Sequence, residues 1–69
     1  MVNDRIRAAI RDSGLKQRYI ADRTGLKEQF LSAILNGSRR VTADEFFSLC
    51  QVLNMTPEEL YNYQSNEAV

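Results

Sequence analysis

The side chains best suited to binding chemistry lie on one face of a predicted helix at residues 27–36. At 100° per residue, the apolar side chains of this segment point one way, and its small or polar side chains point the other way. The second group consists of Gln29, Ser32, Ala33 and Asn36. A glutamine amide can pair with adenine through two hydrogen bonds, a serine hydroxyl can bond to either kind of base edge, and an alanine methyl can touch a thymine methyl. Taken alone, such a face is an ordinary solvated outer face; contacts with base edges in DNA are the alternative, which the rest of the sequence must support.

Two charged residues stand beside that face, at the start of the predicted helix. Lys27 lies at its exposed N-terminal end, and Glu28 follows. Glu28 could accept a hydrogen bond from the amino group of cytosine, or repel a backbone phosphate and so sharpen the choice of site. Recognition helices read bases with their N-terminal residues, so we include both among the candidate base-reading positions.

The charge of the chain is segregated, although the net charge is zero. Residues 1–40 hold all nine lysines and arginines and only four acids, whereas residues 41–69 hold five acids and no base. Such segregation favours a polyanionic partner, although carboxylates at helix starts explain part of the acidic half. Arg39 and Arg40 follow Asn36-Gly37 directly, and we expect this loop to contact phosphates through Asn36, Arg39 and Arg40, unless the two arginines are solvated loop charges.

Composition argues against several other classes of protein. The chain has no histidine and a single cysteine, Cys50, so an intrachain disulfide, the usual zinc or haem sites and histidine-based acid–base catalysis are excluded. No apolar run exceeds three residues, and residues 1–5 lack the pattern of a secretory signal. We therefore predict a cytoplasmic protein that is not an enzyme and that needs no cofactor, metal or membrane.

The apolar spacing is helical almost throughout and predicts an all-α fold. Three helices are expected at about residues 3–13, 17–23 and 27–36, with Gly14 as a left-handed C-cap. Two Thr-x-x-Glu capping boxes, beginning at Thr42 and Thr56, predict the starts of a fourth and a fifth helix, and Asn54 is expected to end the fourth in the left-handed conformation. Residues 1–63 are predicted to form one domain, followed by a frayed tail at residues 64–69.

The segment 17–36 meets the steric requirements of a helix-turn-helix. Ala21 supplies a small side chain where two helices cross, and Gly25 supplies the positive φ that a three-residue turn requires. The apolar side chains expected to hold the two helices on the body are Ile20, Leu26, Leu31 and Ile34.

The pattern Gln17-x-x-Ile20-Ala21-x-x-Thr24-Gly25-Leu26, followed by Leu31, Ile34 and Asn36-Gly37, resembles the lambdoid phage repressor and Cro family, also called the Xre family. The resemblance covers residues 3–62. It implies a compact five-helix lambda-repressor-like bundle in a repressor-like, sequence-specific DNA-binding regulator from a bacterium or phage. In the family, the second helix of the motif enters the major groove, and the glutamine matched by Gln17 contacts phosphate. Because operators are usually read by symmetric pairs, we also expect a homodimer, at least on DNA.

Lys16 and Lys27 depart from the family pattern, which commonly has Ser, Thr or Asn as N-caps at these two positions. A lysine cannot accept hydrogen bonds from the open amides at a helix start, and losing a cap costs about 0.5–2 kcal/mol. Our hypothesis is that both lysines are placed to meet DNA phosphates. The alternative is that the true caps lie a residue or so away.

Other departures concern apolar side chains. Phe30 and Leu35 replace residues that are usually polar in the family, and we expect them to make additional contacts with the core or with the first helix; stacking on a base is the alternative. Phe47, Tyr61 and Tyr63 are candidates for a self-association patch or, equally, for the partly buried edge of the core.

A second function remains open at this point. The zero net charge and the acidic C-terminal half would also suit a protein-binding helix-turn-helix adaptor, antitoxin-like or antirepressor-like, with little affinity for DNA.

Overall fold

The structure is a computed structural model and describes residues 1–64. Five helices make up the secondary structure of this part of the chain. They are α1 (Val2–Ser13), α2 (Gln17–Thr24), α3 (Glu28–Leu35), α4 (Ala43–Leu53) and α5 (Pro57–Tyr61). The predicted all-α fold is confirmed, and no strand occurs within residues 1–64. The predicted tail at 64–69 lies, apart from Gln64, outside the described residues.

The helix ends follow the local chemistry of the sequence. Thr42 and Thr56 both form complete capping boxes: in the first, Thr42 Oγ1 accepts from the Glu45 amide at 3.2 Å and the Thr42 amide donates to Glu45 Oε1 at 2.9 Å. Gly14 ends α1 with a φ of 74°, and Asn54 ends α4 with a φ of 57°, both in the left-handed region. These predictions of starts and stops are confirmed, because each depends only on neighbours within a few residues.

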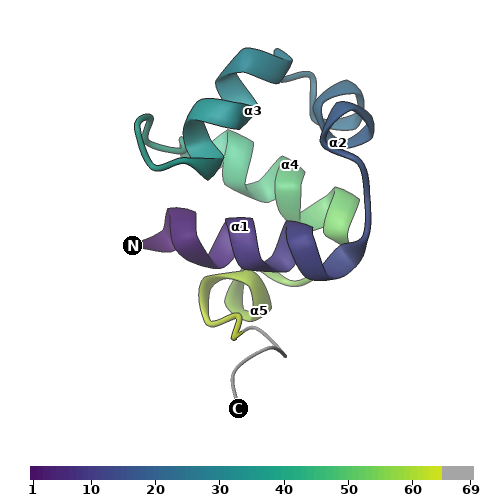
Figure 1. Ribbon diagram of the computed structural model, residues 1–69. Helices are drawn as coiled ribbons and strands as arrows, with labels where there is room; N and C mark the ends of the chain where they lie inside the picture. Colours follow the sequence, from purple (N-terminus) through teal and green to yellow (C-terminus); the bar gives the residue numbers. More distant parts are fainter. Residues whose placement is uncertain (65–69) are drawn as a thin grey trace.

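The apolar core lies where the five helices meet. α4 crosses the middle of the bundle, α2 packs against it, and α1 packs on α5 and α3 (Figure 1). The core side chains are Ile6, Ala9, Ile10, Ile20, Ala21, Leu31, Ile34, Leu49, Cys50 and Leu60. In this arrangement α2 and α3 lie at one end of the molecule and α5 at the opposite end (Figure 1).

Among residues 1–64, one buried residue is polar, and it ties α1 to the end of α3. The Asn3 side chain, 3% exposed, donates through Nδ2 to the carbonyl oxygens of Ile34 and Arg39, each at 2.9 Å. Asn3 therefore determines where the C-terminal end of α3 and the following loop sit on the bundle.

The described helices are all too short or too polar to cross a membrane.

Candidate nucleic-acid interface

The turn between α2 and α3 sets the angle at which α3 leaves the bundle. Gly25 follows α2 with a φ of 76°, a conformation that costs glycine little. Thr24 Oγ1 donates to the Ile20 carbonyl oxygen at 2.8 Å and accepts from the Leu26 amide at 3.4 Å, which closes the turn. Ala21 is buried where α2 meets the core. Two buried side chains, Leu31 and Ile34, then hold the inner face of α3 on the bundle.

The outer face of α3 is uncovered. The structure leaves its polar side chains exposed and its one small apolar side chain half-buried. The exposed residues are Glu28, Gln29, Ser32 and Asn36, and the half-buried one is Ala33. The sequence-predicted base-reading residues on α3 thus lie together on one accessible surface, with Lys27 at its N-terminal end.

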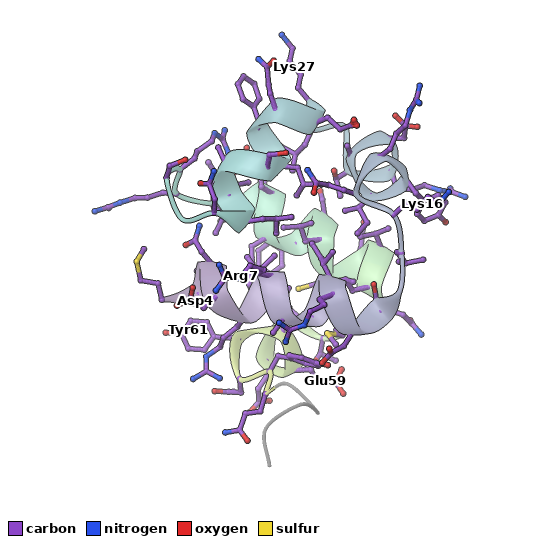
Figure 2. The ribbon with its side chains drawn as sticks, viewed as in Figure 1. Asp4, Arg7, Lys16, Lys27, Glu59 and Tyr61 are labelled. Carbon is purple, nitrogen blue, oxygen red and sulfur yellow. The ribbon has the colours of Figure 1, made fainter. Side chains whose placement is uncertain are left out.

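Both helices of the motif begin without a side-chain cap. The N-cap residues are Lys16 for α2 and Lys27 for α3, both with extended backbone and neither with a capping hydrogen bond. The alternative that the true caps lie a residue away is therefore wrong. Figure 2 shows both lysine side chains pointing away from the body, with Lys27 on the side farthest from α5. Each helix start consequently presents open backbone amides next to an ammonium group.

Arg39 is half-buried and pairs with a carboxylate of the same chain, whereas Arg40 is exposed. The Arg39 guanidinium donates to both carboxylate oxygens of Glu45, each at 2.9 Å. This pairing raises the pKa of Arg39 and is the main reason why the pKa of Glu45 falls to about 2. Sequence reasoning placed Arg39 in the loop but did not predict this partner. Within the loop, the charge of Arg40 is therefore the one more readily available to a phosphate.

Phe30 does not enter the core, which corrects the expectation from the sequence. Phe30 is 38% exposed, and two cations lie over its ring, Lys27 Nζ at 5.7 Å and Arg39 Cζ at 5.1 Å from the ring centroid. Cation–π attraction replaces the expected apolar contacts. The companion expectation for Leu35 is confirmed, since this side chain packs against the core.

Acid should weaken the fold through Glu45. Its folded pKa of about 2 lies below its ordinary value of 4.5, so the stabilisation is complete above pH 4.5 and disappears as the pH falls towards 2. We expect Glu45→Gln to lower the thermal midpoint at pH 6. The difference in thermal midpoint between wild type and this variant should shrink as the pH falls towards 2. Thermal unfolding followed by circular dichroism between pH 2 and 7 measures both effects.

The neighbouring exposed carboxylate supplies the matched control for this experiment. Asp44→Asn leaves the Arg39–Glu45 pair intact. The difference in thermal midpoint between Asp44→Asn and Glu45→Gln should therefore also shrink in acid. A gap between wild type and Glu45→Gln that stays constant from pH 7 to pH 2 would contradict this role of Glu45.

The three aromatic residues considered for self-association separate into two groups. Phe47 and Tyr61 are 53% and 62% exposed and border an apolar hollow that Val2, Val41 and Phe46 also line. Tyr63 instead packs against the core, and its hydroxyl donates to Asp12 Oδ2 at 2.6 Å, which raises the pKa of Tyr63. Tyr63 therefore serves contacts within the chain.

Cys50 is 3% exposed, and burial raises the pKa of its thiol, so the thiol stays protonated at neutral pH. In this state it is a poor nucleophile.

A tight turn between two short helices, with the outer face of the second uncovered, defines the class of helix-turn-helix DNA-binding domains. A helix-turn-helix family model matches residues 6–60, and the chain belongs to this family, in its Cro/C1-type, Xre-like form. This is a family of DNA-binding proteins that regulate transcription. Searches of curated proteins and of solved structures returned no match.

Proposed function

We propose that this protein is a sequence-specific, repressor-like regulator that places α3 in the major groove of an operator. The observation that carries the proposal is the uncovered edge of α3, where Gln29, Ser32 and Ala33 face outward while Leu31 and Ile34 are buried. An α-helix fits the major groove, where every base pair presents a distinct pattern of donors, acceptors and methyl groups.

In this proposal the base edges are read from the N-terminal two turns of α3. Gln29 pairs with an adenine, Ala33 touches a thymine methyl, and Glu28 selects for cytosine or against a misplaced phosphate. Lys27 reaches a base or phosphate from the start of the helix, and Ser32 contributes a hydroxyl.

Phosphate contacts come from both ends of the motif. Lys16 and Gln17 act at the start of α2, where open amides add to the positive charge. Beyond α3, Arg40 binds phosphate directly, and the Asn36 amide group remains available because the Ser38 amide occupies only its Oδ1, at 2.9 Å. Arg39 contributes more weakly to phosphate binding, since the Glu45 carboxylate already pairs with its guanidinium.

Two copies are expected to bind one operator through equivalent half-sites. The surface we assign to the contact between them is the apolar hollow bordered by Phe47 and Tyr61. Arg5 and Tyr61 together line a neighbouring hollow, and the exposed Asp44 directly follows Ala43, which lines the apolar one. A two-fold contact can pair these opposite charges between copies, which favours a second copy of this chain as the occupant.

Binding to DNA at several salt concentrations tests the function. With mixed-sequence duplex, the logarithm of the affinity should fall linearly with the logarithm of the salt concentration, with a slope of about −0.9 per phosphate contacted. Selection from a random DNA pool should then return an inverted repeat that binds two chains per duplex. Absence of binding at low salt would reject the proposal and favour the protein-binding adaptor.

Two single variants separate base reading from phosphate binding. Gln29→Ala should cost about 1–3 kcal/mol on the selected operator and relax the preference at one base pair. Arg40→Ala should weaken binding to all sequences alike and reduce the salt slope by about 1. Affinities measured on the operator and on its single-base variants, at several salt concentrations, test both expected effects. Equal losses on every sequence for both variants would contradict these roles.

A further inference from the structure

One side-chain hydrogen bond joins the two helices of the motif. The amide nitrogen Nε2 of Gln17, the first residue of α2, donates to Oγ of Ser32 on the exposed face of α3, fifteen residues further along the chain. Gln17 is half-buried and Ser32 is exposed, so the bond lies at the surface proposed to meet DNA. It connects a proposed phosphate-binding residue to a proposed base-reading residue.

The direction of this bond leaves Ser32 with an unused donor. A serine hydroxyl has one hydrogen to donate and two lone pairs, and Gln17 occupies one lone pair. The hydroxyls of the last residues of α1 and α2, in contrast, donate to carbonyl oxygens of their own helix: Ser13 to Ile10 at 2.6 Å, and Thr24 to Ile20 at 2.8 Å. Within residues 1–64, no acceptor takes the hydrogen of the Ser32 hydroxyl.

Resting on the proposed function, we infer that Gln17 is a positioning residue that orients Ser32 to donate a hydrogen bond to an acceptor on a base edge. In the major groove such acceptors are the O6 and N7 of guanine, the N7 of adenine and the O4 of thymine, whereas cytosine offers only an amino donor. The Gln17–Ser32 pair therefore selects guanine, adenine or thymine over cytosine at one operator position. The second N–H of the Gln17 amide stays available for phosphate, so backbone register and base reading are linked.

Reversing the polarity of the pair tests this inference. Glu at position 17 can only accept, so in Gln17→Glu the Ser32 hydroxyl must donate to the new carboxylate and present its lone pairs to the base. Wild type should favour guanine, adenine or thymine over cytosine by about three- to tenfold at one position, as one hydrogen bond allows. Ser32→Ala should abolish this preference, and Gln17→Glu should shift it towards cytosine.

The measurement is the ratio of affinities within each variant, across four duplexes that differ at a single base pair of the selected operator. Every operator position is scanned in this way, so the position read by Ser32 is the one where Ser32→Ala changes the ratio. A general loss of affinity caused by the added negative charge cancels in the ratio. Arg18→Ala is the matched control, because it makes the same change in net charge at the neighbouring residue and leaves Gln17 and Ser32 intact. It should weaken all four duplexes equally.

The outcomes separate this inference from the function on which it rests. If wild type binds DNA specifically but Ser32→Ala keeps every base preference, Ser32 reads no base and the inference is wrong. If Ser32→Ala loses a preference while Gln17→Glu keeps the wild-type order, Gln17 does not orient the hydroxyl and the inference is again wrong. If wild type binds no duplex at low salt, the proposed function and this inference both fail.

Discussion

Replacing Asn3 by leucine is expected to remove about 1.5–3 kcal/mol of stability, a large part of the roughly 5 kcal/mol available to a domain of this size. The leucine side chain has the same branched shape and the same number of heavy atoms, but it has no donor. The carbonyl oxygens of Ile34 and Arg39 would both lose the 2.9 Å hydrogen bonds that they accept from the Asn3 amide. The Ile34 carbonyl keeps the Gly37 amide as a donor, at 3.2 Å, so it loses one hydrogen bond, which contributes about 0.5–1.5 kcal/mol. The Arg39 carbonyl keeps no donor within residues 1–64, which costs about 1–3 kcal/mol, at the lower end because this carbonyl is only partly buried.

Asn62→Leu provides the matched control for this variant, since it makes the same chemical change at an exposed position. It should alter stability by about 0.5 kcal/mol or less. Urea unfolding of the two variants and of wild type measures the differences. If Asn3→Leu unfolds at the same urea concentration as wild type, Asn3 does not hold the end of α3 in place.

Replacing Lys16 and Lys27 by serine is expected to stabilise the protein while weakening its binding to DNA. A serine hydroxyl can accept from the open amides at each helix start, which contributes about 0.5–2 kcal/mol per helix. Removing the two ammonium groups also ends their repulsion with the helix dipoles. At the same time, the slope of log affinity against log salt should become shallower by about 0.9 for each phosphate that a lysine no longer neutralises.

The double alanine variant separates the two effects. It removes the same charges without supplying caps, so it should lose DNA affinity as the serine variant does but gain less stability. Thermal unfolding and salt titrations of both double variants provide the comparison. A serine variant with higher stability, unchanged affinity for DNA and an unchanged salt slope would show that the two lysines contact no DNA phosphate.

Much of the fold and the outline of the candidate site were predictable from the sequence. The capping boxes at Thr42 and Thr56, the left-handed stops at Gly14 and Asn54, and the missing caps at Lys16 and Lys27 all appear in the structure as predicted. Each of these features depends on hydrogen bonds between residues within about four positions, so the chemistry is complete in a short stretch of sequence. The outward face of α3 followed in the same way from helical periodicity.

The burial of Asn3 could have been predicted from its spacing in the sequence, but the sequence analysis did not predict it. Asn3 stands three residues before Ile6 and seven before Ile10, both on the buried stripe of α1, so helical periodicity alone would have placed a polar side chain inside the core. Its acceptors lie 31 and 36 residues away, and no local rule identifies them.

The sequence by itself determined where helices begin and end, which side of α3 carries polar groups, and which positions can adopt a positive φ. Only the tertiary structure decided the partners across the chain: Asn3 with the end of α3, Gln17 with Ser32, and Arg39 with Glu45 and Phe30. The reason is geometric. A side chain as long as arginine or glutamine can reach a phosphate, a carboxylate or an aromatic ring equally well, and only the packing of the helices places one of these within reach.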